Sequence, residues 1–387
     1  MNDAEAFRDF GLAPEHVQFR DQFRRFVSER ISPIAERAER EGTFPREVYD
    51  ELRRGGYLAA NYPEEVGGGG GDLITGCIFY EELTRAAAGI SAGVFAHQHL
   101  AAGPLLRFGT ATQKVELLQP ALRGELIGAF GLTEPDAGSD IRGIKTRARK
   151  VGDGWVLDGS KLYITNGGIA DFMLVAARTG AGRDAGSLTL FVVRTKGNEG
   201  VTASELRKVG NHSSSTAYVS LEDVHVSQDD VLGEVGRGVA QLKATLTEGR
   251  ILVANRGMGI AQEALDCILR YSGERHAFGK PIGSFQGVAF KIAEMAARVD
   301  AVRLMIYRAA RLAMAGHECM REASMAKFLA SEAAVHVAST SLLLHGGAGY
   351  MEEMKVARLY RDAPEAWIGE GTNEIQLLVI ARSLGLA

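Results

Sequence analysis

Cysteine is scarce in this sequence, with only Cys77, Cys267 and Cys319 among 387 residues. An odd, widely spaced set argues against a disulfide framework and is typical of a reducing cytoplasm. None of the three stands in a CxxC motif, and no His/Cys cluster has metal-site spacing, so no metal is expected. No apolar run reaches the roughly 18 to 20 residues that span a bilayer. The sequence therefore predicts a soluble, cytoplasmic protein without membrane insertion.

An excess of one charge is also lacking, because Lys and Arg number 44 and Asp and Glu number 48. The formal net charge of −4 gives no reason to expect a surface for a polyanion, so no nucleic-acid partner is predicted. Hydrophobic residues make up 46% of the chain and charged residues 24%, which is ordinary for a globular enzyme. At this length we expect two or three domains.

Two nucleotide-binding signatures are missing. The five glycines at 67 to 71 are not followed by GK[ST], so they do not make a P-loop and predict a plain flexible loop. No GxGxxG follows a strand pattern and no βαβ alternation is present, which argues against a Rossmann domain.

The pattern of apolar residues changes twice along the chain. Residues 1–125 show helical three- and four-residue steps, as at Phe19, Phe23 and Phe26. Residues 126–235 carry short β-branched and aromatic runs separated by turn residues, which predict strands. Residues 236–387 return to long helical patterns with short connections. We therefore expect an α+β protein of three domains: an N-terminal helical domain, a middle β-barrel or sandwich, and a C-terminal four-helix bundle.

One carboxylate stands in an unusual place near the end of the chain. In "WIGEGTNEIQ", Glu370 lies between Gly369 and Gly371, after an apolar run and before a helical pattern. A polar turn that begins a helix would explain the pattern. A general base presented to a ligand would explain it as well, because glycines allow close backbone approach.

Four stretches together resemble the acyl-CoA dehydrogenase family over essentially the whole chain. They are "GLTEPDAGSD" (131–140), "KLYITNGG" (161–168), "GERHAFGKPIGSFQ" (273–286) and "HGGAGYMEEMKVARLYRDAPEAWIGEGTNEIQ" (345–376). The resemblance implies an FAD enzyme that desaturates an acyl thioester between its α- and β-carbons. It also implies a homotetramer and an electron-transfer flavoprotein as electron acceptor.

The resemblance assigns roles to individual residues. Glu370 is expected to remove the α-proton while hydride passes from the β-carbon to flavin N5. The residues expected to contact the substrate are Ser139, Thr247, Arg250 and Gly371. The residues expected to bind FAD, some across a subunit interface, are Phe130, Leu132, Thr133, Gly138, Ser139, Tyr163, Thr165, Arg275, Phe278, Phe285, Gln286, Leu343, Gly346, Gly347, Thr372 and Glu374.

Several positions depart from the family pattern. Leu343 replaces a glutamine that bonds FAD in many relatives, and Gly249 stands where some relatives carry their base. On the thioester side, Thr247 replaces an aspartate, and His212 and Ser215 replace an arginine and an aspartate. A carrier-protein thioester therefore stays open beside a CoA thioester. Two further functions stay open as well: a flavin oxidase or monooxygenase, and a non-catalytic partner subunit of a shared flavin site.

Overall fold

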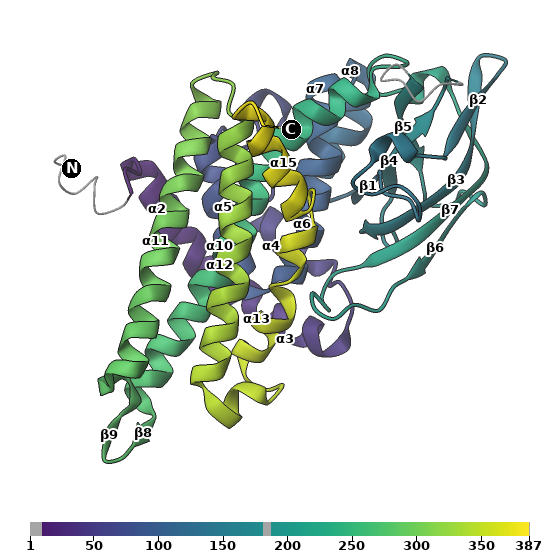
Figure 1. The fold of residues 1–387 in the computed structure, drawn as a ribbon. Helices are drawn as coiled ribbons and strands as arrows, with labels where there is room; N and C mark the ends of the chain where they lie inside the picture. Colours follow the sequence, from purple (N-terminus) through teal and green to yellow (C-terminus); the bar gives the residue numbers. More distant parts are fainter. Residues whose placement is uncertain (1–9, 181–186, 387) are drawn as a thin grey trace.

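The computed structural model describes residues 10–180 and 187–386, which fold into helical layers beside one curled sheet (Figure 1). The N-terminal part of the described chain is helical, and its helix α5 is almost entirely buried. The helices of this part are α2 (Pro14–Phe26), α3 (Ser32–Glu41), α4 (Glu47–Arg54), α5 (Leu73–Ala86), α6 (Ala88–Phe95), α7 (Gly103–Phe108), α8 (Ala111–Gln113) and α9 (Gln119–Leu122). Short π-helical segments continue several of them, at Val27–Ile31, Ala96–Ala102 and Lys114–Leu118.

The glycine-rich loop differs from the prediction of a plain flexible connection. Its backbone N–H groups donate to carbonyls of the preceding segment, as from Gly69 to Ala59 and from Gly71 to Ala60, both at 2.9 Å. A Cβ at Gly68 would lie 2.1 Å from the carbonyl oxygen of Tyr62. The glycines are therefore needed for close packing of backbone on backbone.

The middle segment forms a seven-stranded sheet in which β5 pairs with β4, outside the path β1-β4-β2-β3-β7-β6. Its strands are β1 (Gly128–Gly131), β2 (Arg147–Val151), β3 (Gly154–Thr165), β4 (Phe172–Arg178), β5 (Leu188–Arg194), β6 (Val201–Glu205) and β7 (Thr216–Val226). Alternate residues of β4 enter different cores. Phe172 and Leu174 pack with the helices, while Met173 and Val175 fill the inside of the curled sheet. This two-sided burial explains why β4 is apolar from Phe172 to Ala177.

The C-terminal segment is built on three long helices, α10 (Gly238–Glu274), α11 (Gln286–Met314) and α12 (Met320–Leu344). The hairpin of β8 (His276–Ala277) and β9 (Lys280–Pro281) joins α10 to α11 at one end of the bundle, far from the sheet (Figure 1). Three shorter helices follow: α13 (Lys355–Asp362), α14 (Glu365–Ile368) and α15 (Asn373–Ser383), the last of which packs on α12.

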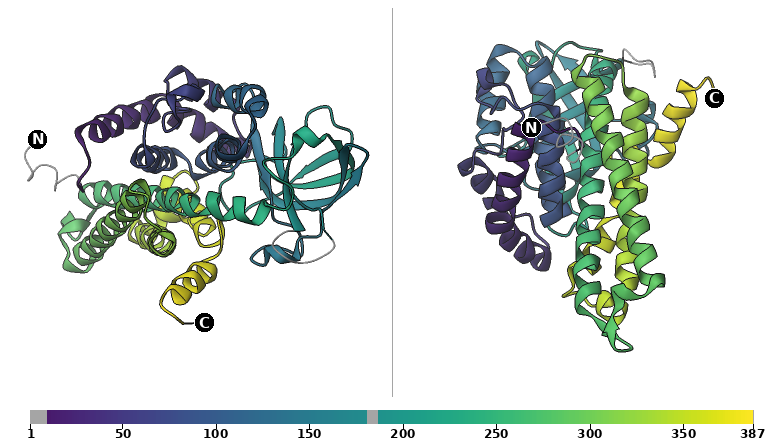
Figure 2. Two further views of the ribbon diagram at one scale, coloured as in Figure 1. Left: turned by 90° about the horizontal axis from the view of Figure 1, so that it is seen from above. Right: turned by 90° about the vertical axis from the view of Figure 1, so that its left-hand side faces the viewer.

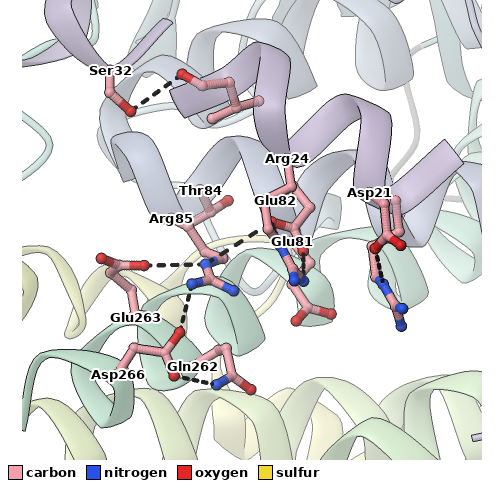
Figure 3. A network of polar contacts seen from close by, with 12 residues as sticks. Asp21, Arg24, Ser32, Glu81, Glu82, Thr84, Arg85, Gln262, Glu263 and Asp266 are labelled. Atoms are coloured by element: carbon pink, nitrogen blue, oxygen red, sulfur yellow. Dashed lines mark hydrogen bonds and ion pairs between the residues drawn. The ribbon is translucent and has the colours of Figure 1, made fainter. Parts of the chain in front are cut away.

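The N-terminal helices and the bundle share one hydrophobic core, which includes Phe23, Leu83, Leu252 and Val337 (Figure 2). Ion pairs cross the same junction (Figure 3). The Arg85 guanidinium on α5 reaches Glu263 at 3.1 Å and Asp266 at 2.5 Å, both on α10. These contacts fix α5 against α10, the helix that borders the site described below. In residues 10–180 and 187–386, no helix is long and apolar enough to cross a membrane.

Candidate active site

Glu370 lies in the short loop between α14 and α15. Its backbone is left-handed, with φ of 56°, and the following Gly371 has φ of 88°. A non-glycine residue in this region is strained and is held there by its surroundings. The side chain of Gln376 in α15 donates to the carbonyls of Glu370 at 3.3 Å and Gly371 at 2.9 Å, and Thr372 caps the helix. The loop is thus fixed by the first turns of α15.

The Glu370 residue is half-buried, but its Oε2 atom is buried without a hydrogen-bond partner. Desolvation by burial raises the pKa of this carboxyl from 4.5 to about 7, and the Glu365 carboxylate adds to the rise. The cations of Arg256, Arg250 and Lys327 oppose it. A carboxylate poised near neutral pH and lacking a partner suits a general base.

Two of those cations were missed by the sequence analysis. Arg256 on α10 lies 3.2 Å from Oε2 of Glu365, and Lys327 on α12 donates to Oδ1 of Asn373 at 3.0 Å. Burial lowers the pKa of Lys327 to about 8. Each of the two could have been suspected from the sequence, because each is a single basic residue inside an otherwise apolar helical stretch. Such a charge is rarely buried unless it has a partner.

Gly249 on α10 lies opposite Glu370 and has no side chain to fill the space in front of the carboxylate. A Cβ at Gly249 would lie 3.5 Å from Oε2 of Glu370 and 2.9 Å from Nε2 of His99. Position 249, where some relatives carry their base, therefore borders the carboxylate of Glu370. The neighbouring Glu248 points away and pairs with Arg107, as helix geometry predicts. His99 was not found from the sequence, because nothing marks a histidine in a helix as a site residue.

A second group of predicted residues lies on the sheet, at the ends of β1 and β3. The segment after β1 holds Leu132 and Thr133, and the Thr133 carbonyl accepts the N–H of Leu162 at 2.9 Å. Tyr163 sits at an irregularity in the pairing of β3 with β7, with φ of 60° and 66% of its surface exposed. Phe130 and Thr165 are partly exposed nearby, and Gly138 and Ser139 lie in an exposed turn beyond Thr133.

A third group lies at the opposite end of the molecule, beside the β8–β9 hairpin (Figure 1). Phe278 at the hairpin tip has φ of 50° and is 95% exposed, and its ring contacts Phe285. Arg275 and Gln286 flank the hairpin. The stacked rings of Tyr271 and His345 place Leu343, Gly346 and Gly347 at the same end. One chain therefore does not bring this group to Glu370, and a shared site would need a second copy.

The exposed groups fit FAD. An open aromatic face at Tyr163 and the half-exposed Thr133 hydroxyl suit an isoalloxazine ring, and Arg275 offers a guanidinium fork to phosphate. Three of these residues, Tyr163, Phe278 and Glu370, are among the non-glycine residues with left-handed backbone. Such strain tends to concentrate at functional sites.

Three family models match consecutive parts of the chain. The N-terminal domain of acyl-CoA dehydrogenase matches residues 13–125, its middle domain residues 129–224 and its C-terminal domain residues 236–385. A probable acyl-CoA dehydrogenase of Bacillus subtilis is 40% identical over 97% of this chain and 99% of its own length. The caffeyl-CoA reductase-Etf complex subunit CarC of Acetobacterium woodii is 38% identical, covering 92% and 94%.

Solved structures agree. Butyryl-CoA dehydrogenase from Megasphaera elsdenii superposes with a TM-score of 0.92 at 38% identity, covering 96% of this chain and 98% of that one. The prolyl acyl carrier protein oxidase AnaB also superposes with a TM-score of 0.92, at 32% identity, covering 97% and 100%. The chain therefore belongs to the acyl-CoA dehydrogenase family, whose members are FAD-dependent oxidoreductases that act on acyl-CoA.

Proposed function

We propose that this protein introduces a double bond between the α- and β-carbons of an acyl thioester, with Glu370 as the base. The observation that carries the proposal is the unpartnered Oε2 of Glu370, whose pKa burial raises to about 7. The α-proton of a thioester is weakly acidic. A hydrogen-bond donor to the thioester carbonyl oxygen makes this proton more acidic, and a base whose pKa lies near the working pH removes it most efficiently. We assign that donor role to the backbone N–H of Glu370.

FAD supplies the acceptor for the hydride that leaves the β-carbon. This chain would hold the cofactor with the segment after β1, with Tyr163 and Thr165 of β3, and with Thr372 and Glu374 at the start of α15. The exposed hairpin group, Arg275 and Phe278 with Gln286, would serve the FAD of a neighbouring subunit. The proposed active unit is therefore an oligomer, and we infer a homotetramer.

An electron-transfer flavoprotein is the proposed acceptor of the electrons. The support is the similarity to a subunit of a caffeyl-CoA reductase-Etf complex, at 38% identity. We also place the protein in the cytoplasm, because Cys77, Cys267 and Cys319 are all free thiols.

A carrier-protein thioester is the second candidate substrate, and one observation favours it. The Nε atom of Arg250 is buried without a partner, and the hydroxyl of Thr247 donates to the Lys243 carbonyl instead. An aspartate at position 247 would have offered a carboxylate beside this arginine. The similar protein AnaB is named an oxidase of a prolyl carrier protein.

The test is anaerobic flavin absorbance of the purified holoenzyme during titration with acyl thioesters, each on CoA and on a carrier protein. One class should bleach the flavin and so identify the carrier. Glu370→Gln should retain FAD but lose about 10²- to 10⁴-fold in reduction rate, which is what a general base typically contributes. Glu353→Gln, on an exposed turn, is the matched control and should keep the full rate.

Other results would lead to other functions. Full turnover of Glu370→Gln would overturn the assigned mechanism. Peroxide formed in step with turnover in air would indicate an oxidase instead. A colourless protein that binds no FAD would favour the non-catalytic partner subunit.

A further inference from the structure

A small chamber lies beside α10, on the side that faces α5 and the segment Ala96–Ala102. Its volume is about 50 Å³, and polar groups make up about half of its wall. The side chains that matter here are Tyr62, Tyr80, Gln98, His99, Arg107 and Glu248. A chamber meant for a long hydrocarbon chain would be lined by apolar side chains. This wall therefore calls for an explanation.

The chamber adjoins the base through His99. Thr245, Glu248 and Leu252 line the chamber from one face of α10, and Gly249 lies on that same face. The Cβ position of Gly249 is within 2.9 Å of the imidazole Nε2 of His99 and 3.5 Å of Oε2 of Glu370. His99 thus stands between the carboxylate of Glu370 and the chamber, with no side chain of residue 249 intervening.

Two hydroxyl groups of the wall donate their protons to hydrogen bonds within the protein. The hydroxyl of Tyr62 donates to the Gln98 carbonyl at 2.5 Å, and the hydroxyl of Tyr80 donates to Oε1 of Gln98 at 2.8 Å. Their oxygen lone pairs remain available. Glu248 and Arg107 pair with each other, so together they carry no net charge.

His99 is an acceptor too. Its Nε2 lies 3.1 Å from the Thr245 carbonyl oxygen, which can only accept, so Nε2 carries the proton. Burial lowers the pKa of His99 to about 4, so the ring is neutral at pH 7 and Nδ1 keeps its lone pair. A group that enters beside His99 gains most if it brings a hydrogen-bond donor.

We propose that the natural substrate has a short acyl group whose far end carries a hydroxyl or amino group, and that His99 selects it. This inference rests on the proposed dehydrogenase function, which supplies the thioester. The volume supports a short group, since a water-sized group needs roughly 10–15 Å³ and the chamber holds about four of them. A longer apolar chain would have to displace His99 and pack against the polar side chains Gln98, Arg107 and Glu248.

The test compares γ-hydroxybutyryl and pentanoyl thioesters, which differ by a hydroxyl in place of a methyl group. Both are prepared on CoA and on a carrier protein, and flavin reduction of the holoenzyme is followed without oxygen. We expect kcat/KM for the hydroxy compound to be at least about tenfold higher, because a site built to bond a hydroxyl discriminates against its absence. Octanoyl thioester should be the poorest of the series.

Three variants test which side chains select the substrate. His99→Ala should raise kcat/KM for octanoyl thioester at least about tenfold and reduce the hydroxyl preference to below threefold. Tyr80→Phe removes one acceptor from the wall and should weaken the preference without admitting octanoyl thioester. His336→Ala, at the bundle surface, is the matched control and should change neither quantity.

The outcomes separate the two proposals. If butyryl and every other thioester leave the flavin oxidised, the dehydrogenase function itself is wrong. If butyryl thioester bleaches the flavin but pentanoyl and γ-hydroxybutyryl thioesters react equally, only the inference about His99 and the chamber is overturned. If His99→Ala does not fold, the substrate comparison and the Tyr80→Phe variant decide whether the inference holds.

Discussion

The Nζ atom of Lys161 lies 2.7 Å from Oε1 of Glu134, inside the middle domain, where both side chains are buried. Lys161 also donates to the carbonyls of Leu132 at 3.2 Å and Ala176 at 2.8 Å. Glu134 accepts the N–H of Thr146 at 3.0 Å. The pair therefore ties the segment after β1, which carries Thr133, to β3 and β4.

Lys161→Met should destabilise the protein by about 3–5 kcal/mol, because it leaves the Glu134 carboxylate buried without its cation. Lys145→Met is the matched control, since the Lys145 side chain is 71% exposed and pairs with Asp136 at the surface. We expect the control to cost about 0–1 kcal/mol. Urea unfolding of the two variants measures both values. Equal losses of unfolding free energy in the two variants would show that the buried pair of Lys161 and Glu134 stabilises the fold no more than the surface pair does.

Glu370 gives the reaction a pH dependence whose sign is fixed. The base acts only when ionised, and burial raises its pKa from 4.5 to about 7. The rate of flavin reduction should therefore fall about tenfold per pH unit below pH 7 and level off above it. Stopped-flow absorbance between pH 5 and 9 measures the profile. A rate that does not change across this range would contradict Glu370 as the base.

Arg256 offers a second check on the same group. Its guanidinium is the largest of the influences that lower the pKa of Glu370. Arg256→Gln should therefore move the midpoint of the rate profile to higher pH. A midpoint that moves down, or stays in place with FAD bound normally, would mean that another group controls the profile.

The exposed hairpin predicts a link between assembly and cofactor. Phe278→Ser and Arg275→Ala should weaken FAD binding at least about tenfold, although the β8–β9 hairpin that they belong to lies at the end of the bundle far from the sheet (Figure 1). The reason is that the FAD of the neighbouring subunit would lose the contacts that this hairpin makes to its pyrophosphate. Analytical ultracentrifugation and FAD fluorescence measure assembly and affinity together. A variant that stays monomeric yet binds FAD tightly would contradict the shared site.

Much of the fold could be predicted from the sequence, because the apolar spacing changes from helical to strand-like and back along the chain. The family resemblance also predicted Glu370 and its loop. The surroundings of Glu370 could not be predicted, since His99, Arg256 and Lys327 come from three separate helices that only the tertiary packing brings together. The glycine loop was misjudged because glycine needed for packing and glycine needed for flexibility look alike in a sequence.

Gly249 should be intolerant of even one added carbon. A methyl group there would lie 2.9 Å from Nε2 of His99, closer than real Cβ contacts. Gly249→Ala should cost about 1–3 kcal/mol, as overpacking typically does. In the double variant with His99→Ala the cost should largely disappear, because the clashing ring is gone. Additive costs in a thermodynamic cycle from urea unfolding would contradict this contact.

Asp362 should make the protein more stable in mild acid than at pH 8. Desolvation by burial raises its pKa from 3.8 to about 7, and the nearby Glu39 carboxylate adds to the rise. Its Oδ1 accepts the Asn211 N–H at 2.6 Å, whereas Oδ2 is buried without a partner. Between pH 3.8 and 7 the folded state binds more protons than the unfolded state, so stability falls as pH rises.

Asp362→Asn removes this cost while keeping an acceptor for the Asn211 N–H. The variant should therefore be about 1–3 kcal/mol more stable than the parent at pH 8 and nearly equal to it at pH 4. Thermal unfolding at the two pH values measures the difference. The adjacent His212 stands where relatives carry an arginine, and its ring bonds the Lys208 carbonyl at 3.2 Å rather than a carboxylate. A stabilisation that is the same at both pH values would show that packing around Asp362, and not its buried charge, limits the stability of the protein.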